Sequence, residues 1–204
     1  MPRIASRRFV LALVAFALPA SLFAAPSDPL ETPAKPSLKG QLLIATPAMR
    51  DPRFEHAVIL MVRHGQDGAM RIVINRPLGE QLLAALGAKD LAAAGSVRVF
   101  LGGPVQPEIG FVVHSSDYHR PDTIAVDGRI AVTSSREILR DIADKAGPMK
   151  SLIAFGFAGW APGQLEGELA HNVWYTAPAD PGLVSDDDRD KVWEHATAHR
   201  TQDL

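Results

Sequence analysis

The sequence predicts a single α/β (mixed α+β) domain, in which helices flank a mixed β-sheet. Strand-like apolar runs far outnumber helical patterns in the first half of the domain, whereas helices come between strands in the second half. Runs such as 57–62 are continuously apolar rather than alternating, which is typical of a sheet covered on both faces. The order is not a regular βαβ series, so the sequence does not predict a doubly wound fold.

Composition agrees with one globular domain and excludes several kinds of chemistry. The 204 residues are 47% hydrophobic and 22% charged, which is enough to build a core of ordinary size. Cysteine is absent from the sequence, so thiol catalysis, disulfides and cysteine-bound metals are excluded. The formal net charge of −2 provides no broad basic field for a nucleic acid.

The first 24 residues have the build of a secretory signal peptide. Arg3, Arg7 and Arg8 form a positive start, and an apolar stretch of 15 residues follows at 9–23. Such a stretch is short for a membrane-spanning helix, which needs roughly 20 residues. We therefore expect cleavage near residue 24 and no membrane span in the mature chain. An uncleaved inner-membrane anchor is the alternative.

The export signal leaves two routes open. Residues 6–11 (SRRFVL) fit the minimal twin-arginine pattern, which also arises by chance in ordinary signals. Either route predicts a periplasmic or secreted protein. Cleavage after residue 24 removes three arginines and no acidic residue, so the net charge falls from −2 to −5. We therefore expect an unknown protein or small-molecule partner rather than a nucleic acid.

A proline-rich linker at 25–39 precedes the domain, which we place at 40–204. Four prolines and little apolar bulk predict an extended arm. The domain then opens with a hairpin around the turn at 65–68 and a short helix after the turn at 75–79. The elements predicted in this half are strands at 41–45, 57–62 and 69–74, and a helix at 80–86.

The second half alternates strands and helices. Ser134 and Glu137 have the spacing of a capping box, which predicts a helix that starts at Ser134. Asp127-Gly128 is a strong hairpin signal. The predicted elements are strands at 97–101, 110–115, 123–126, 130–132, 151–157 and 173–176, and helices at 134–146, 164–172 and 185–200.

A glycine-rich corner at 156–166 (GFAGWAPGQLE) joins a strand to a helix. Its glycines would let backbone N–H groups approach an anion near the start of that helix. However, the spacing matches neither a dinucleotide fingerprint nor a phosphate loop, and Pro162 removes one donor. The corner is therefore either one wall of a ligand site or a packing corner in which Trp160 covers small residues.

Other strand ends carry polar or glycine residues that suggest a cleft. Arg76 is either a carboxylate or phosphate ligand or a solvated turn residue. His114 allows an alternative, hydrolase-like enzyme that uses Ser115 or Glu166, although the sequence contains no nucleophile elbow. The candidate ligand-binding residues are Asn75, Arg76, Gly102, Gly103, His114, Gly159, Trp160, Gly163, Gln164 and Glu166.

The histidines give little support to a metal site. His195 and His199 have the i, i+4 spacing that presents two ligands on one helix face. The residues between them are Ala-Thr-Ala, so the glutamate of a metalloprotease motif is absent. We predict neither a metal nor a cofactor, and we assign no catalytic residue.

With these segments in hand, the chain resembles the YqgE/AlgH family of bacterial proteins. The likeness covers about residues 39–196. The blocks that carry it are LIATP at 43–47, DPRF at 51–54, IVINRP at 72–77, LGGPV at 101–105, GFVVH at 110–114, GFAGWAPGQLE at 156–166 and NVW at 172–174.

The resemblance implies a single α/β domain with a mixed, partly barrel-like sheet, but no established reaction. Some members are described as transcriptional regulators connected with alginate production. This chain departs from the pattern at Arg71, where relatives usually have glycine, and in its export signal. We therefore expect a non-enzymatic exported binding or accessory protein. A hydrolase-like enzyme and a transcriptional regulator are the alternatives.

Overall fold

The computed structural model describes residues 36–78, 99–185 and 188–201. The expected signal peptide, most of the expected linker and the helix expected at 80–86 lie outside these residues. In the described part of the chain, no helix is long and apolar enough to cross a membrane.

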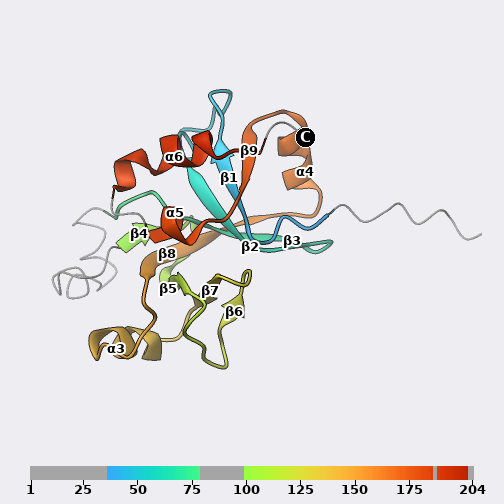
Figure 1. Ribbon diagram of the computed structural model, residues 1–204. Helices are drawn as coiled ribbons and strands as arrows, with labels where there is room; N and C mark the ends of the chain where they lie inside the picture. Colours follow the sequence, from blue (N-terminus) through green and yellow to red (C-terminus); the bar gives the residue numbers. More distant parts are fainter. Residues whose placement is uncertain (1–35, 79–98, 186–187, 202–204) are drawn as a thin grey trace, which may run out of the picture. The chain divides into compact units, whose positions relative to one another are not determined.

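Strand β8 (Ser151–Trp160) lies at the centre of the sheet (Figure 1). Strand β5 (Val105–Ser115) runs antiparallel along one side of it. On the other side, β4 (Val99–Leu101) pairs in parallel with the first half of β8, and β3 (Gly68–Val73) pairs antiparallel with its last three residues. Strand β8 therefore contacts three other strands and links the part of the sheet that contains β5 to the part that contains β3.

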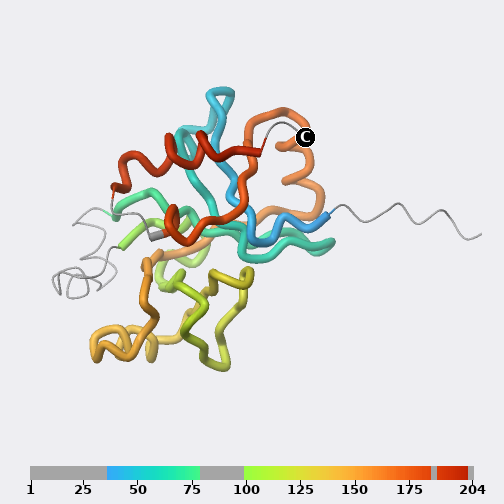
Figure 2. The backbone as a smooth tube through the Cα atoms, viewed as in Figure 1, coloured from blue at the N-terminus to red at the C-terminus, as the bar shows by residue number. Residues whose placement is uncertain are grey.

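The sheet is mixed and open. Among the described residues it has nine strands, of which eight follow the order β6-β7-β5-β8-β3-β2-β1-β9, and it is not closed into a barrel (Figure 2). The remaining pairs on this path are also antiparallel. The strands not yet given are β1 (Gln41–Ala45), β2 (Val58–Gly65), β6 (Ile124–Ala125), β7 (Ile130–Thr133) and β9 (Trp174–Pro178).

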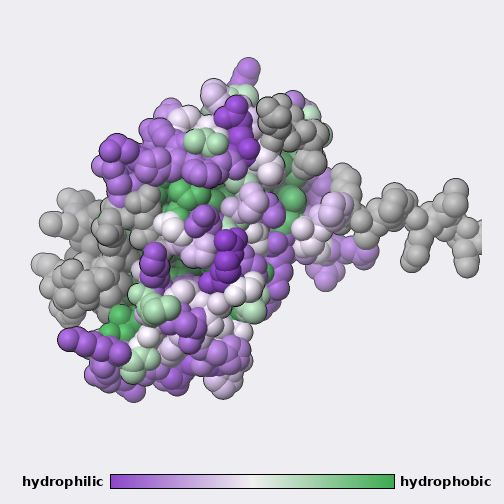
Figure 3. All heavy atoms as spheres, in the orientation of Figure 1, coloured by the Kyte–Doolittle hydropathy of each residue, from purple (hydrophilic) through white to green (hydrophobic). Residues whose placement is uncertain are grey.

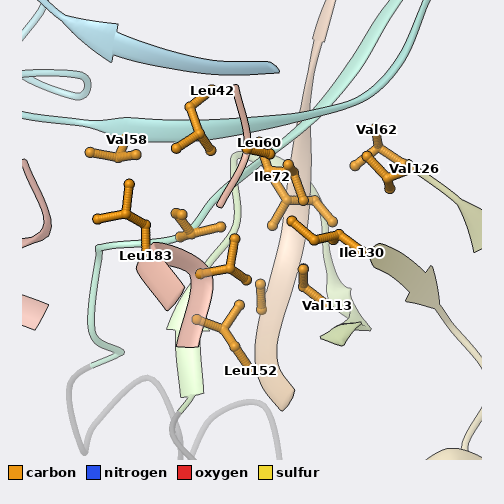
Figure 4. Packing of buried hydrophobic residues seen from close by; sticks show 14 of the residues in the cluster. Leu42, Val58, Leu60, Val62, Ile72, Val113, Val126, Ile130, Leu152 and Leu183 are labelled. Carbon is orange, nitrogen blue, oxygen red and sulfur yellow. The ribbon is translucent and has the colours of Figure 1, made fainter. Parts of the chain in front are cut away.

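Apolar residues fill both faces of the sheet, as the continuous apolar runs predicted. Leu42 lies opposite Leu60 and belongs to the larger core cluster (Figure 4), whereas the neighbouring pair Leu43 and Ile59 belongs to a second cluster. Successive strand residues point to opposite faces, so each run supplies both clusters. Each fully buried aliphatic side chain contributes about 1.5–3 kcal/mol to folding.

Short helices cover these clusters. Helices α5 (Pro181–Ser185) and α6 (Val192–Ala198) contribute to the larger cluster, and α4 (Gln164–Ala170) contributes Leu165 to the second. Helix α3 (Glu137–Ala143) packs in a third cluster, near the far end of β5. Hydrophilic residues cover most of the face seen in Figure 3, where only small hydrophobic areas are visible.

Two of the predicted helix starts are wrong. Helix α3 begins at Glu137, and its N-cap residue, Arg136, makes no side-chain capping bond. The capping box predicted from Ser134 does not form, and the N–H of Ser135, in the segment before the helix, donates to Asp122 from another loop. Ser185 ends α5 instead of starting the last helix, which begins with a 3₁₀ turn at Arg189–Lys191.

Two strands are longer than predicted. Strand β5 begins at Val105 rather than residue 110, and β8 continues to Trp160 rather than residue 157. Between them the register shifts, since Val105 lies opposite Phe157 but Gly110 lies opposite Phe155. Gly156, inside this irregularity, has φ 72°, and a Cβ there would collide with the carbonyl oxygen of Gly103. Glycine is therefore required at the point where β8 passes close to the segment that leads into β5.

Candidate functional site

His114, on β5, is buried opposite Ser151, the first residue of β8, and both of its ring nitrogens are hydrogen-bonded. Its Nδ1 donates to the carbonyl oxygen of Ser115 (2.8 Å), so Nε2 accepts from the Thr133 hydroxyl (2.9 Å). The Ser115 hydroxyl donates to the carbonyl of Lys150 instead. Burial lowers the pKa of His114 below its ordinary value, which favours the neutral ring. These contacts are those of a structural histidine.

Asn75 and Arg76 hold the loop before β2. The Asn75 side chain accepts from the N–H of Val58 and donates to the carbonyl of His56, both at 2.8 Å. Arg76 donates to the carbonyl of Glu55 at 2.6 Å. His56 has φ 52°, a conformation that non-glycine residues rarely adopt, and these bonds stabilise it.

Glycines 102 and 103 are packing residues of the same kind as Gly156. The N–H of Gly102 donates to the carbonyl of Phe155, and a Cβ on Gly103 would collide with the backbone of Phe157. Close approach of β8 therefore explains both glycines. The next residue, Pro104, reaches the pocket described below.

The end of the glycine-rich corner anchors helix α4. Gly163 has φ 77° and is the N-cap of this seven-residue helix. Glu166 accepts a hydrogen bond from Nε2 of His64 at 3.2 Å, because the Nδ1 of His64 already accepts the N–H of Leu38. Glu166 and His114 lie near opposite ends of the ten-residue strand β8. The structure therefore does not bring these two residues together.

A pocket of about 360 Å³ lies at the other end of β8. Gly159 and Gln164, both predicted from sequence, line it. We call it the Arg71 pocket, because this buried arginine forms part of its wall. Its other lining residues are Met49, Asp51, Arg53, Phe54, Pro104, Val105, Ala158, Glu168, Val173 and Trp174.

Aromatic rings surround the guanidinium of Arg71. Its central carbon lies 2.9 Å from the ring centroid of Trp160 and 5.1 Å from that of Phe54. Trp174 packs edge-on against both of these rings, with centroids 6.0 Å apart in each case. The attraction of a cation for aromatic faces holds the guanidinium in this cage.

Hydrogen bonding leaves this cation incompletely satisfied. Over the residues that the structure describes, four buried side-chain atoms lack a hydrogen-bond partner: Nε and Nη1 of Arg71, Nε1 of Trp160, and Oγ of Ser135. Three of these four atoms therefore belong to the cage. A buried donor without an acceptor costs about 1–3 kcal/mol, and more when it is charged.

Glu168 is the acidic neighbour of Arg71, but its hydrogen bonds go elsewhere. One carboxylate oxygen accepts from Gln164 (3.1 Å) and the other from the indole N–H of Trp174 (2.8 Å). Burial lowers the pKa of Arg71 to about 9, against the opposing attraction of Glu168. The nearby carboxylate therefore offsets only part of the cost of burying this charge.

The structure thus divides the candidate residues. Gly159 and Gln164 line the Arg71 pocket and Trp160 forms the cage beside it, whereas His114 lies elsewhere. Sequence reasoning missed Arg71, Phe54 and Glu168 as site residues, although a charged residue within an apolar strand was a usable signal at Arg71. No cluster of three or more potential metal ligands is present within residues 36–78, 99–185 and 188–201.

Comparisons with known proteins agree with this mixed α/β architecture. The AlgH-like family model matches residues 42–204. A UPF0301 protein of Afipia carboxidovorans is 45% identical over 174 residues, which cover 78% of this chain and 81% of the relative. A UPF0301 protein of Rhodospirillum rubrum is 48% identical over 151 residues, which cover 72% and 79%.

Solved structures show the same fold. The solution structure of the AlgH protein from Pseudomonas aeruginosa has a TM-score of 0.67 and 40% identity, over 81% of this chain and 90% of that one. A crystal structure from Corynebacterium diphtheriae has the same TM-score at 20% identity, over 82% and 89%, and shows the fold alone. The chain belongs to the YqgE/AlgH family, which the sequence blocks had indicated.

Proposed function

We propose that this chain is a non-enzymatic binding or accessory protein of the periplasm, and that the Arg71 pocket holds a small molecule with a carboxylate or similar oxyanion. The observation that carries the proposal is the caged guanidinium, two of whose buried nitrogens have no acceptor within the described part of the chain. A planar oxyanion that enters the pocket brings an acceptor that the described chain does not provide. Arginine binds a carboxylate at two points along one edge of the guanidinium, so a single carboxylate pairs Nη2 with either Nε or Nη1 and supplies an acceptor to one of these two nitrogens.

The size and lining of the pocket support a small ligand. A volume of about 360 Å³ lies within the range of ligand pockets in proteins. The walls combine the aromatic rings of Phe54 and Trp174 with the polar side chains of Gln164 and Glu168 and with the ion pair of Asp51 and Arg53. Apolar walls with a few placed polar groups are the usual composition of such sites.

The geometry gives no support to the hydrolase alternative. A nucleophilic serine needs its hydroxyl hydrogen-bonded to a general base. The Ser115 hydroxyl instead donates to a backbone carbonyl, and both ring nitrogens of His114 are occupied by other partners. The candidate acid Glu166 contacts His64 near the opposite end of β8.

The export part of the proposal rests on the sequence of residues 1–24 and on the mature charge of −5. It also disfavours the regulator alternative, since a protein outside the cytoplasm does not meet the chromosome. Cell fractionation tests it, with the protein expected in the periplasm. Recovery from the cytoplasm alone would overturn the export proposal, and changing Arg7 and Arg8 to lysine separates the two export routes.

Ligand binding is tested by thermal unfolding and calorimetry with benzoate, hexanoate and inorganic phosphate as probes. We expect at least one carboxylate to stabilise the wild type, by about 2.7 kcal/mol at a concentration 100-fold above its Kd. Arg71→Gln should abolish this shift, whereas Arg140→Gln, on the exposed face of α3, should retain it. Equal shifts in both variants, or none with any probe, would refute the pocket assignment.

A further inference from the structure

A second hollow continues from the Arg71 pocket along helix α4. It has a volume of about 660 Å³, and it shares Gln164, Glu168 and Val173 with the pocket. Shared walls make the two hollows one groove, which we call the α4 groove. The second hollow also includes Ala48, Arg50, Gly167 and His171.

The groove is long compared with a single amino acid. From Gln164 to His171 the chain of α4 and its C-cap rises about 10 Å, at 1.5 Å per residue. An extended peptide advances about 3.3–3.6 Å per residue, so about three peptide residues span this length. The combined space therefore suits a short extended chain.

We propose that the α4 groove binds the C-terminal end of an extended peptide, with the terminal carboxylate at Arg71 and the preceding residues along α4. The inference rests on the proposed function, because it places the oxyanion in the same pocket. Charge complementarity sets the direction: the buried cation Arg71 lines the pocket but not the second hollow, and a peptide has its only obligatory carboxylate at its C-terminus. Phe54 and Trp174 favour an apolar last side chain.

The polar groups where the two hollows meet favour a peptide over a fatty acid. Glu168 and Gln164 line both hollows, and the carboxylate of Glu168 accepts one hydrogen bond on each oxygen. Each carboxylate oxygen can accept a second bond, which a peptide N–H supplies and an acyl chain does not. An acyl chain would also remove these polar groups from water without compensation.

The experiment compares four probes by isothermal titration calorimetry: the tripeptide alanyl-alanyl-leucine, its C-terminal amide, free leucine and octanoate. We expect the tripeptide acid to bind at least tenfold more tightly than each of the others. Equal binding of acid and amide would overturn the role of the carboxylate. Octanoate or leucine binding as tightly as the tripeptide would overturn the peptide assignment while leaving the proposed function intact.

A groove-filling variant separates the two hollows. Gly167 lines the second hollow, and a Cβ at this position meets nothing within 4 Å, so we choose Gly167→Leu to add bulk there and Gly167→Ala as its matched control. We expect the leucine variant to lose at least tenfold in tripeptide affinity and to retain wild-type benzoate affinity, and the alanine variant to bind both nearly normally. Unchanged tripeptide affinity in the leucine variant would refute the groove. If the wild-type protein binds none of benzoate, hexanoate and phosphate, the proposed function is refuted as well.

Discussion

A buried polar side chain lies near each end of strand β8, and the two differ in how far they are hydrogen-bonded. Near the start of β8, His114 has a hydrogen-bond partner on each ring nitrogen. One of these partners, Thr133, is also hydrogen-bonded to Thr123. At the last end, Arg71 is almost as deeply buried, yet two of its nitrogens find no acceptor among the residues that the structure describes. Both residues lie on strands that pair with β8.

This difference distinguishes a residue that serves the fold from one that is available to a ligand. A fully paired buried group stabilises one arrangement of the chain and leaves nothing for a partner. An unpaired buried charge destabilises the free protein, and it persists where function compensates.

Removing the paired side chain should be the most damaging change. His114→Ala removes the acceptor of the Thr133 hydroxyl, which keeps its bond to Thr123, and the donor to the Ser115 carbonyl, and it creates a cavity. We expect a loss of about 3 kcal/mol in the free energy of unfolding, measured by urea denaturation. Benzoate binding to the variant, below its unfolding transition, should be unchanged. A loss below about 1 kcal/mol would mean that the network is not structural.

Removing the charge of Arg71 should increase the free energy of unfolding rather than lower it. Arg71→Met replaces a buried cation by an apolar side chain of similar length, so desolvation no longer opposes folding. We expect the ligand-free variant to gain about 1 kcal/mol in unfolding free energy, after subtraction of the lost cation–aromatic attraction. The same variant should lose carboxylate binding. A marked loss of stability would assign Arg71 to the fold instead.

Lowering the pH should reduce the free energy of unfolding through His114. Burial lowers the folded-state pKa of His114 below the ordinary value of 6.5. Below pH 6.5 the unfolded chain therefore binds a proton that the folded chain does not, and stability falls until the pH reaches the folded-state pKa. Urea denaturation at several pH values should show a shallower fall for His114→Gln than for the exposed control His171→Gln. Equal slopes would contradict this assignment.

Glu166 should matter least. Glu166→Gln keeps an oxygen that can accept the Nε2–H of His64, at a half-buried site. We expect a change of about 0.5 kcal/mol or less in unfolding free energy and no change in benzoate affinity. Titration calorimetry and urea denaturation measure the two quantities. A large loss of affinity would bring Glu166 back as a site residue.

Strands with strong local patterns were the most predictable elements. The continuous apolar runs of β1 and β2 predicted burial on both faces, and the two core clusters confirm it. The start of β5 at Val105 was missed, because residues 105–109 are largely exposed and take strand geometry from their place beside β8. Helix α5 was not predicted, because five residues carry too little periodicity to show a helix.

The candidate site was predicted in part. The corner at 156–166 supplied Gly159 and Gln164, which line the Arg71 pocket. His114 resembled a site residue because it ends a strand beside a serine, and sequence alone does not show whether its ring nitrogens are occupied. Phe54 was not singled out, since an isolated aromatic residue in a turn carries no local signal of a cage.

The sequence alone determined the family, the mixed α/β class and the succession of the main strands along the chain, because these depend on motifs and on periodicities within short windows. Tertiary structure decided which buried polar groups are paired. Arg71 meets Trp160 only because β3 and β8 are neighbours in the sheet, and α4 brings Glu168 to the same place. Hydrogen-bond satisfaction depends on such long-range contacts, and no local pattern encodes it.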